Sequence, residues 1–309
     1  MKVTKPKFWS EKNNFFSLLL IPISFLIQLL NIVKNKFIYS QSFNIPVICV
    51  GNIYLGGTGK TPSSIMITRE LQKLGKKPAI IRKYYPSHSD EHELIKENVD
   101  CLFLNKKRGN AIRDAVKAKY NLAILDDGFQ DDTIKKNLNI LCFNSNQLIG
   151  NGMTIPSGPL RQNINSIKQA QIVLINGDSD NSFEEKILKI SKQIKIFYSK
   201  YIPINIDKFK NKKLFAFAGI GNPENFFKLL SKNNLNVQKK IAFPDHYKFK
   251  KSEIQKMIDE SFSNNLKLVT TEKDYLRVRN FGFKDVQVIK VKLEVQNKDS
   301  FINEVLNYI

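Results

Sequence analysis

The sequence predicts an α/β protein whose main sheet is parallel and is covered by helices on both faces. Short apolar runs of strand length alternate with helical stretches between residues 45 and 175, as is typical of buried parallel strands. A glycine-rich turn ending in Gly-Lys-Thr joins the first such run to a helix. After a lysine-rich stretch near residue 205, a second and smaller α/β unit begins. We therefore expect three parts, with boundaries at 1–40, 41–205 and 206–309.

The composition points to an anionic partner without identifying it. The chain has 309 residues and a formal net charge of +21, which favours nucleic acid, an anionic membrane surface or a phosphorylated substrate. A biased base composition that makes lysine abundant would give the same charge, so both interpretations stay open. Cys49, Cys101 and Cys142 are far apart. They suggest neither a zinc site nor a disulfide framework, and we expect buried thiols in a reducing compartment.

The first expected element is a helix over the apolar run from Phe15 to Val33. Its length would just permit a membrane span. Polar residues interrupt it at spacings that place them on one helical face, and these are Ser17, Ser24, Gln28, Asn31 and Asn35. Lysines flank the run on both sides. We expect a helix lying in the interface of an anionic membrane. The alternatives are a cleaved signal peptide, for which no cleavage site follows, and a helix packed in the core.

The next elements form a phosphate-binding loop. The apolar run 45–50 is expected to be a buried strand, and the helix that follows the glycines is expected to end near Gly75. In this arrangement backbone amides and the helix N-terminus hold phosphate, Lys60 reaches the β- and γ-phosphates, and Thr61 ligates Mg²⁺. The strict motif has glycine where this chain has Tyr54. The expected ATP-binding residues are Tyr54, Leu55, Gly56, Gly57, Thr58, Gly59, Lys60 and Thr61. The main sheet is thus predicted to be of the phosphate-loop NTPase type.

Further strands and helices follow in alternation. Strands are expected at 78–81, 101–104, 122–125, 140–143 and 172–175, a helix at 110–119, and an irregular polar loop at 84–95. In the smaller unit, strands are expected at 214–218, 266–270 and 286–291.

Asp126 and Asp127 end the strand at 122–125. In phosphate-loop enzymes an aspartate at such a position helps to hold Mg²⁺ beside the loop threonine. Asp-Gly is also a common turn pair, so a simple strand-end turn is the alternative. We favour a metal role for Asp126 and Asp127, without assigning which of them binds directly.

An ordered set of motifs resembles the tetraacyldisaccharide 4'-kinase family of lipid A biosynthesis. The matching segments are Val50-Gly51-Asn52, Gly56 to Pro62, Asp126 to Gln130, Gly150-Asn151-Gly152, Pro156 to Arg161, Phe217 to Pro223, Phe243 to Tyr247 and Thr271 to Asp274. The resemblance covers residues 47 to about 275. Some positions depart from the family pattern, and these are Ile81 to Tyr85, Ser89 to His92, Asp131 and Gln162.

The resemblance implies transfer of the ATP γ-phosphoryl group to the 4'-hydroxyl of an acylated disaccharide 1-phosphate, giving the bis-phosphorylated lipid A precursor. It implies ATP and Mg²⁺ as cofactors and the cytoplasmic face of the bacterial inner membrane as the location. It also implies that Asp90 and His246 handle the proton of the hydroxyl, and that both lie between the two domains. Arg108 and Arg161 are predicted to hold substrate or nucleotide phosphates. Lys273 and Asp274 are left without a role.

Two other classes of function fit the sequence less well. A phosphate-loop GTPase would need Asn-Lys-x-Asp, whereas the chain offers Asn176-Gly177-Asp178 and Thr271-Glu272-Lys273-Asp274. A basic nucleic-acid-binding protein would show a helix-turn-helix, zinc-finger or RNP-like signature. We therefore expect no nucleic-acid partner, and the sequence points to no protein partner.

Overall fold

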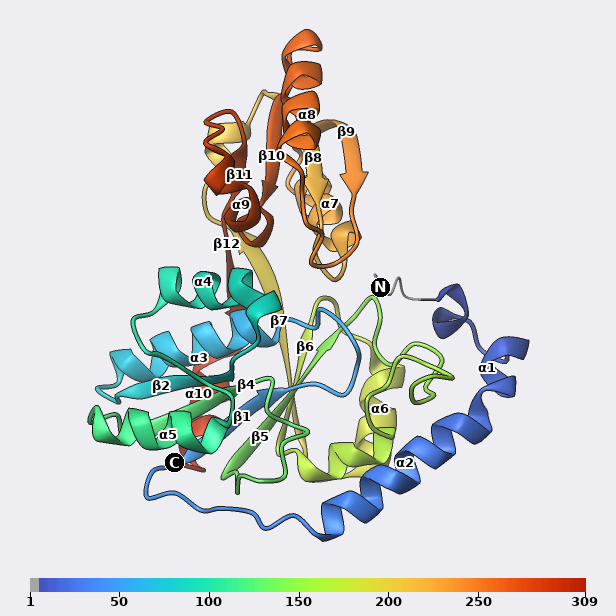
Figure 1. Cartoon of the computed structure of the whole chain (residues 1–309), viewed down its shortest axis with the longest axis vertical. Helices are drawn as coiled ribbons and strands as arrows, with labels where there is room; N and C mark the ends of the chain where they lie inside the picture. The colour runs from blue at the N-terminus through green and yellow to red at the C-terminus, as the bar shows by residue number, and fades with distance from the viewer. Residues whose placement is uncertain (1–5) are drawn as a thin grey trace.

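The computed structural model describes residues 6–309 and contains two sheets, one above the other in Figure 1. The larger sheet has eight strands in the order β12-β7-β6-β5-β1-β4-β2-β3. Its strands are parallel except for the pairing of β12 with β7. Its strands are β1 (Val47–Gly51), β2 (Pro78–Lys83), β3 (Leu102–Asn105), β4 (Leu122–Asp126), β5 (Leu138–Asn144), β6 (Ile172–Asn176), β7 (Lys195–Pro203) and β12 (Val291–Val295).

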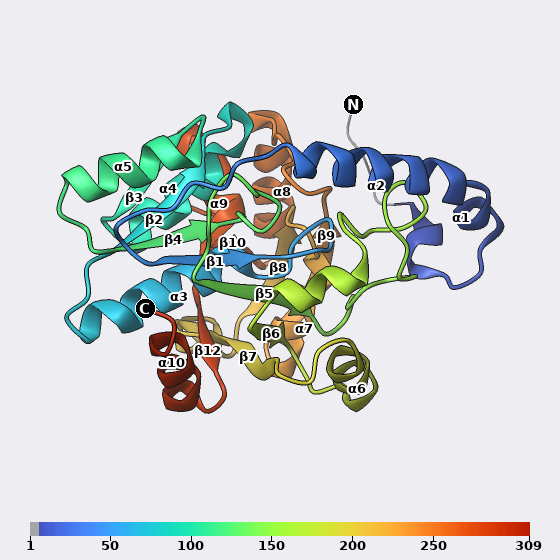
Figure 2. The ribbon, with the colours of Figure 1, turned by 90° about the horizontal axis from the view of Figure 1, so that it is seen from below.

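Helices cover both faces of this sheet because its central strands are apolar on both sides. Apolar residues of α3 and α10 pack against Ile48 and Val50, and those of α5 and α6 belong to the core on the other face, with Val47 and Cys49. The helices of this part are α3 (Lys60–Lys73), α4 (Ser89–Asn98), α5 (Arg108–Lys117), α6 (Asn181–Ile190) and α10 (Lys298–Leu306). Figure 2 shows these layers from below. The predicted fold class is confirmed.

The smaller sheet has four parallel strands in the order β11-β10-β8-β9. One of its faces packs on α7, and the other packs on α8 and α9. Its strands and helices are β8 (Lys213–Ala218), α7 (Pro223–Lys232), β9 (Asn236–Ala242), α8 (Lys251–Ser263), β10 (Lys267–Thr271), α9 (Glu272–Val278) and β11 (Gln287–Ile289).

The chain crosses between the two sheets twice, through β7 and β12 (Figure 1). The smaller sheet ends at Ile289, and β12 and α10 return to the larger sheet. The prediction that 206–309 form one unit is therefore wrong at its C-terminal end. A single residue, Lys290, separates β11 of the smaller sheet from β12 of the larger sheet. The single strand expected at 286–291 therefore corresponds to parts of two strands in different sheets.

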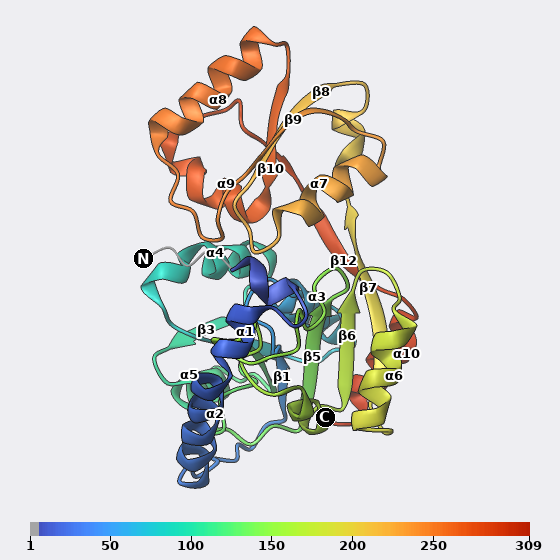
Figure 3. The same ribbon diagram turned by 90° about the vertical axis from the view of Figure 1, so that its right-hand side faces the viewer.

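Two helices, α1 (Phe15–Leu19) and α2 (Ile21–Lys36), run along the outside of the larger domain (Figures 1 and 3). Their polar stripe faces the protein. Ser24 is buried and donates to the Thr154 carbonyl at 2.9 Å, and the Asn35 amide donates to Asp132 at 2.7 Å. The apolar side chains are exposed instead, and these are Phe15, Phe16, Leu18, Leu19, Ile21, Ile23, Phe25, Leu26, Ile27, Leu29, Leu30, Ile32 and Val33. Within residues 6–309, no helix has both the length and the apolar character needed to cross a membrane.

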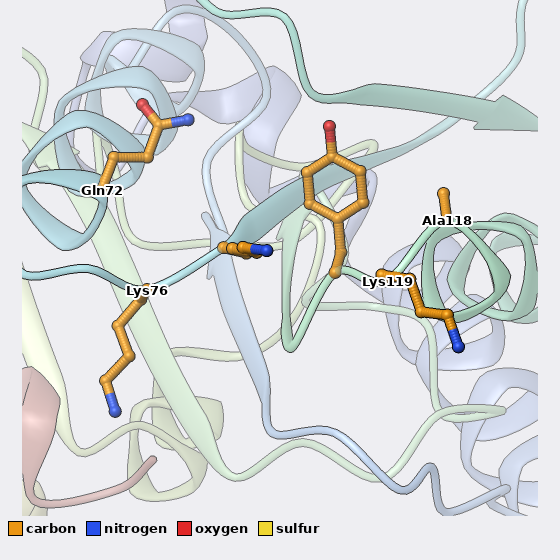
Figure 4. Close-up of a pocket in the computed structure, with 6 residues that line it drawn as sticks. Gln72, Lys76, Ala118 and Lys119 are labelled. Atoms are coloured by element: carbon orange, nitrogen blue, oxygen red, sulfur yellow. The ribbon is translucent and has the colours of Figure 1, made fainter.

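A shallow hollow of about 290 Å³ lies at the amino ends of β2 and β4 (Figure 4). Its lining consists of Gln72, Lys76, Lys77, Ala118, Lys119 and Tyr120. The glycine-rich loop follows the carboxyl end of β1, at the opposite edge of the sheet. In open α/β sheets the ligand binds at that carboxyl edge.

Candidate active site

The glycine-rich loop joins β1 to α3, and Lys60 is the first residue of that helix. Gly59 has φ +90°, which favours glycine. A Cβ atom at Gly59 would lie 2.2 Å from Asn176 Nδ2. The loop also packs on the proline-rich stretch, because the Leu55 amide donates to the Pro159 carbonyl at 2.8 Å. The backbone is thus held in a turn that leaves the N-terminus of α3 in a position to bind an anion such as phosphate.

Two buried asparagines hold this loop in shape, and the sequence analysis missed both roles. Nδ2 of Asn52 lies 2.6 Å from the Tyr54 carbonyl, 3.2 Å from the Gly56 carbonyl and 2.9 Å from Thr58 Oγ1. The Asn176 amide donates to the Thr58 carbonyl and accepts from the Ser199 hydroxyl. Asn52 directly follows β1, and Asn176 is the last residue of β6. A polar residue at the carboxyl end of an apolar strand was the signal available in the sequence.

Asp126 and Asp127 lie beside the first turn of α3. Asp126 is fully buried and accepts from Thr61 Oγ1 at 3.0 Å and from Ser64 Oγ at 3.1 Å. Asp127 Oδ1 lies 3.6 Å from Lys60 Nζ and accepts from Arg161 at 2.9 Å. The structure therefore brings together the predicted Thr61, Lys60 and both aspartates.

The charges of this group depend on one another. Burial lowers the pKa of Lys60, and the nearby Asp127 carboxylate opposes that shift. Burial alone would raise the pKa of Asp127, but Lys60 and Arg161 outweigh it and hold the pKa well below its usual range. Asp127 thus stays ionised next to the phosphate-binding loop.

Asp90 and His246 come from different domains and lie next to each other. Asp90 is in the first turn of α4, and His246 is in the loop between β9 and α8. His246 Nδ1 is 3.4 Å from Asp90 Oδ2, close enough for an ion pair, but this nitrogen has no hydrogen-bond partner among the described residues. Burial alone would raise the pKa of Asp90, but His246, Lys273 and Arg277 outweigh it and keep the pKa well below its ordinary value.

A charge network, defined here as Arg82, Glu91, Lys273, Asp90 and Arg277, links this pair to Asp126. Arg82 pairs with both Asp126 and Glu91. Glu91 Oε1 is 2.9 Å from Lys273 Nζ, and Arg277 Nε donates to Asp90 at 2.8 Å. Arg82, Glu91 and Asp90 belong to the larger domain, whereas Lys273 and Arg277 lie on α9 of the smaller one.

The loop predicted over residues 84–95 is wrong, because α4 occupies most of it. The buried residues of this helix are Asp90, His92 and Ile95. Two of these three are polar, so the hydrophobic periodicity that reveals a helix was absent. Of these, Asp90 pairs with Arg277 of the smaller domain.

The two domains also touch directly at the phosphate-binding loop. A Cβ atom on Gly221, in the loop after β8, would lie 2.7 Å from the Gly57 backbone nitrogen and 3.0 Å from Gly57 Cα. Both neighbours are backbone atoms, so neither can move aside as a side-chain end would. Only glycine fits at this contact.

We expect Gly221→Ala to lower kcat by about 10²-fold, because a shift of about 1 Å between reacting groups costs that much. The control is Gly109→Ala on α5, where a Cβ would meet mainly the end of the Gln41 side chain, at 3.2 Å. Steady-state phosphoryl-transfer rates and melting temperatures of both variants would be compared. Unchanged kcat in Gly221→Ala would show that the contact is not needed in catalysis.

A family model described as Tetraacyldisaccharide-1-P 4'-kinase matches residues 16–309. The chain belongs to this kinase family. It is 41% identical over 310 residues to a tetraacyldisaccharide 4'-kinase of Pelagibacter ubique, covering 99% of this chain and 98% of that protein. A Rickettsia typhi protein of the same name is 33% identical, with 98% of each chain covered. The predicted family and kinase activity are confirmed.

A solved structure supports the fold of this kinase. The crystal structure of LpxK from Aquifex aeolicus in complex with ATP superposes with a TM-score of 0.73, at 21% sequence identity. The match covers 95% of this chain and 99% of that one. The overall fold is therefore shared with that protein.

Arg108 and Arg161 of this kinase lie close to the predicted metal residues. Arg108 pairs with Asp131 at 2.9 Å and donates to the Asp127 carbonyl at 2.6 Å. Asp131 supplies a carboxylate to Arg108. Both arginines thus pair with carboxylates in this structure, and their role toward phosphates stays a prediction.

The residues beside Lys60 fit Mg²⁺. Thr61, Asp126 and Asp127 offer a hydroxyl and two carboxylates, which are the hard oxygen donors that Mg²⁺ prefers. The described residues contain no cluster of three or more His, Cys, Asp or Glu side chains of the kind that holds a metal alone. Mg²⁺ in kinases takes few protein ligands and shares the rest with phosphates and water, so the donor set suits this ion.

Proposed function

We propose that this chain transfers the γ-phosphoryl group of ATP to the 4'-hydroxyl of a tetraacyldisaccharide 1-phosphate. The supporting observation is the charge network. It runs from Asp126, beside the phosphate-binding loop, to Asp90 of the larger domain and His246 of the smaller domain. Family membership supports the identity of the acceptor. The phosphates of ATP would lie on the loop and α3, and the sugar hydroxyl would lie near Asp90.

Three kinds of group would act on the nucleotide. Lys60 and the loop amides neutralise the charge that spreads over the phosphate oxygens during transfer. Thr61, Asp126 and Asp127 would hold Mg²⁺, which supplies further charge neutralisation on the β- and γ-phosphates when bound. Asn52 and Asn176 keep the loop amides in place.

Asp90 and His246 would handle the proton of the hydroxyl, which is a poor nucleophile until that proton has an acceptor. Asp90 is ionised, and its Oδ1 atom is buried without a hydrogen-bond partner in the described chain. Its Oδ2 atom already accepts two hydrogen bonds from Arg277. We therefore place the incoming hydroxyl at Oδ1.

A kinase assay tests this proposal. The wild-type protein, Mg²⁺ and γ-³²P-labelled ATP would be mixed with the tetraacyldisaccharide 1-phosphate in detergent micelles, and the lipids would be separated by chromatography. A labelled, doubly phosphorylated lipid that disappears with EDTA is the expected product. Hydrolysis of ATP with unlabelled lipid would mean that the acceptor is wrong.

We also propose that α1 and α2 dock this enzyme on the anionic cytoplasmic face of the bacterial inner membrane. Ser17 and Ser24 of their polar stripe are buried against the protein, and more than ten large apolar side chains are exposed. A contiguous apolar face of this kind marks an interaction site, and basic residues near it suit anionic headgroups. The membrane-embedded acceptor would thereby reach the enzyme along the bilayer surface.

Vesicle binding checks this docking face. Phe25→Glu is expected to weaken binding to phosphatidylethanolamine–phosphatidylglycerol vesicles by about tenfold or more, since burying one phenylalanine contributes about 2 kcal/mol. Phe262→Glu, on α8 of the smaller domain, is the matched control because the two side chains are 68% and 60% exposed. Equal vesicle flotation of both variants would contradict the proposal.

A further inference from the structure

Lys273 is a lysine that the sequence left without a role, and it lies at the centre of the interdomain site. It is the second residue of α9, and its side chain is only 17% exposed. Its Nζ atom lies 2.9 Å from Glu91 Oε1, 3.6 Å from Asp245 Oδ1 and 3.9 Å from Asp90 Oδ2. Three carboxylates thus surround one ammonium group.

The same Nζ atom lies 3.4 Å from His246 Nε2. An ammonium group has only donors, so a hydrogen bond at this position requires Nε2 to be the acceptor. A neutral imidazole that accepts at one nitrogen carries its proton on the other. The proton is then on Nδ1, which lies 3.4 Å from Asp90 Oδ2 and has no hydrogen-bond partner among the described residues.

The remaining contacts hold the ring in this orientation. The His88 ring stacks on the His246 ring with centroids 5.0 Å apart and planes 12° apart. The backbone of His246 has φ +54°, in the left-handed region that is uncommon for residues other than glycine. Glu91 Oε1 and Asp245 Oδ1 also approach Nε2, at 3.8 and 3.9 Å, but carboxylates cannot donate. Arg82 pairs with Glu91, and Arg277 pairs with Asp90.

We infer that Lys273 is a positioning residue that fixes His246 as the Nδ1-protonated tautomer, so that the ring presents its N–H group on the side of Asp90 Oδ2, 3.4 Å away. Asp90 Oδ1, buried and without a partner in the described chain, is left as the atom that takes the proton of the hydroxyl. The O–H bond breaks as the proton passes to Oδ1, and the electron pair of the hydroxyl oxygen forms the new bond to the γ-phosphorus. The bond from that phosphorus to the β–γ bridging oxygen of ATP breaks, and ADP leaves with its electrons. The catalytic role of Lys273 rests on the proposed function, whereas the tautomer of His246 is independent of it.

Nitrogen NMR of ¹⁵N-histidine-labelled protein tests the tautomer without an activity measurement. The chain has three histidines, His88, His92 and His246, so the His246 signals are those that vanish in His246→Gln. In the wild type we expect a proton on Nδ1 and none on Nε2. In Lys273→Met we expect Nε2 to gain a proton, whereas Lys273→Arg keeps a donor there and should retain the wild-type pattern.

Kinetics of the same variants supply the second readout. Lys273→Met is expected to lower kcat by about 10²-fold with little change in KM for ATP, and Lys273→Arg to restore part of it. A wild-type protein that carries the proton on Nε2 would overturn the inference even if Lys273→Met does not fold. An unchanged ¹⁵N pattern in a folded Lys273→Met variant would also overturn it. If the wild type shows the expected tautomer but phosphorylates no lipid, the proposed function fails and the tautomer assignment stands.

Discussion

Lys60→Ala is expected to lower kcat for phosphoryl transfer by about 10³-fold or more. Lys60 begins α3, and its side chain is 12% exposed and 3.6 Å from Asp127. It brings a positive charge into a largely dry site, where its effect on the charged transition state is much larger than in water. Alanine would leave Asp127 with Arg161 as its remaining ion-pair partner and would remove the group that we propose to contact the transferring phosphates.

The matched control for this variant is Lys73→Ala. Lys73 ends the same helix, and its side chain is 66% exposed and pairs with Glu70. Transfer rates at saturating ATP and melting temperatures would be measured for both variants. A Lys60→Ala protein that keeps more than a tenth of the wild-type kcat would show that the loop does not hold the reacting phosphates.

Asp90→Asn and His246→Gln are expected to lower kcat by about 10²- to 10⁴-fold, the usual contribution of general acid–base groups. Asparagine keeps the shape of the side chain but cannot take the proton. Neither residue touches the phosphate-binding loop in the described contacts. The dissociation constant for ATP should therefore change little.

The control for these two variants is Glu93→Gln. Glu93 also lies on α4 and pairs with a residue of the smaller domain, Arg279, but at an exposed position. Single-turnover rates would separate the chemical step from product release. If Asp90→Asn reacts at the wild-type rate, Asp90 is not the proton acceptor.

The phosphate-binding loop could be predicted from sequence because its requirements are local. A buried strand, a turn with Gly59 at positive φ and a helix beginning at Lys60 are encoded within about 20 residues. Asp126 was predicted for the same reason, since it ends an apolar strand. In each case neighbouring residues in the chain determine the conformation.

The interdomain part of the site could not be predicted in this way. The buried face of α4 is polar, and its partners Arg277 and Lys273 are more than 180 residues away in the chain. The same holds for β12, whose pairing with β7 is visible only in three dimensions. The N-terminal helices show the limit most clearly. Their polar stripe was predicted, but only the burial of Ser24 reveals that the polar side faces the protein.

The most direct test of the account is to follow ATP consumption and lipid phosphorylation in one reaction. Wild-type enzyme, Mg²⁺, ATP and the tetraacyldisaccharide 1-phosphate in micelles would be sampled over time, and the product would be analysed by two-dimensional ¹H–³¹P NMR. We predict one new lipid phosphate for each ATP consumed, with its phosphorus signal coupled to the proton at the 4' carbon. Consumption of ATP without a lipid phosphate, or a phosphate on another hydroxyl, would contradict the account.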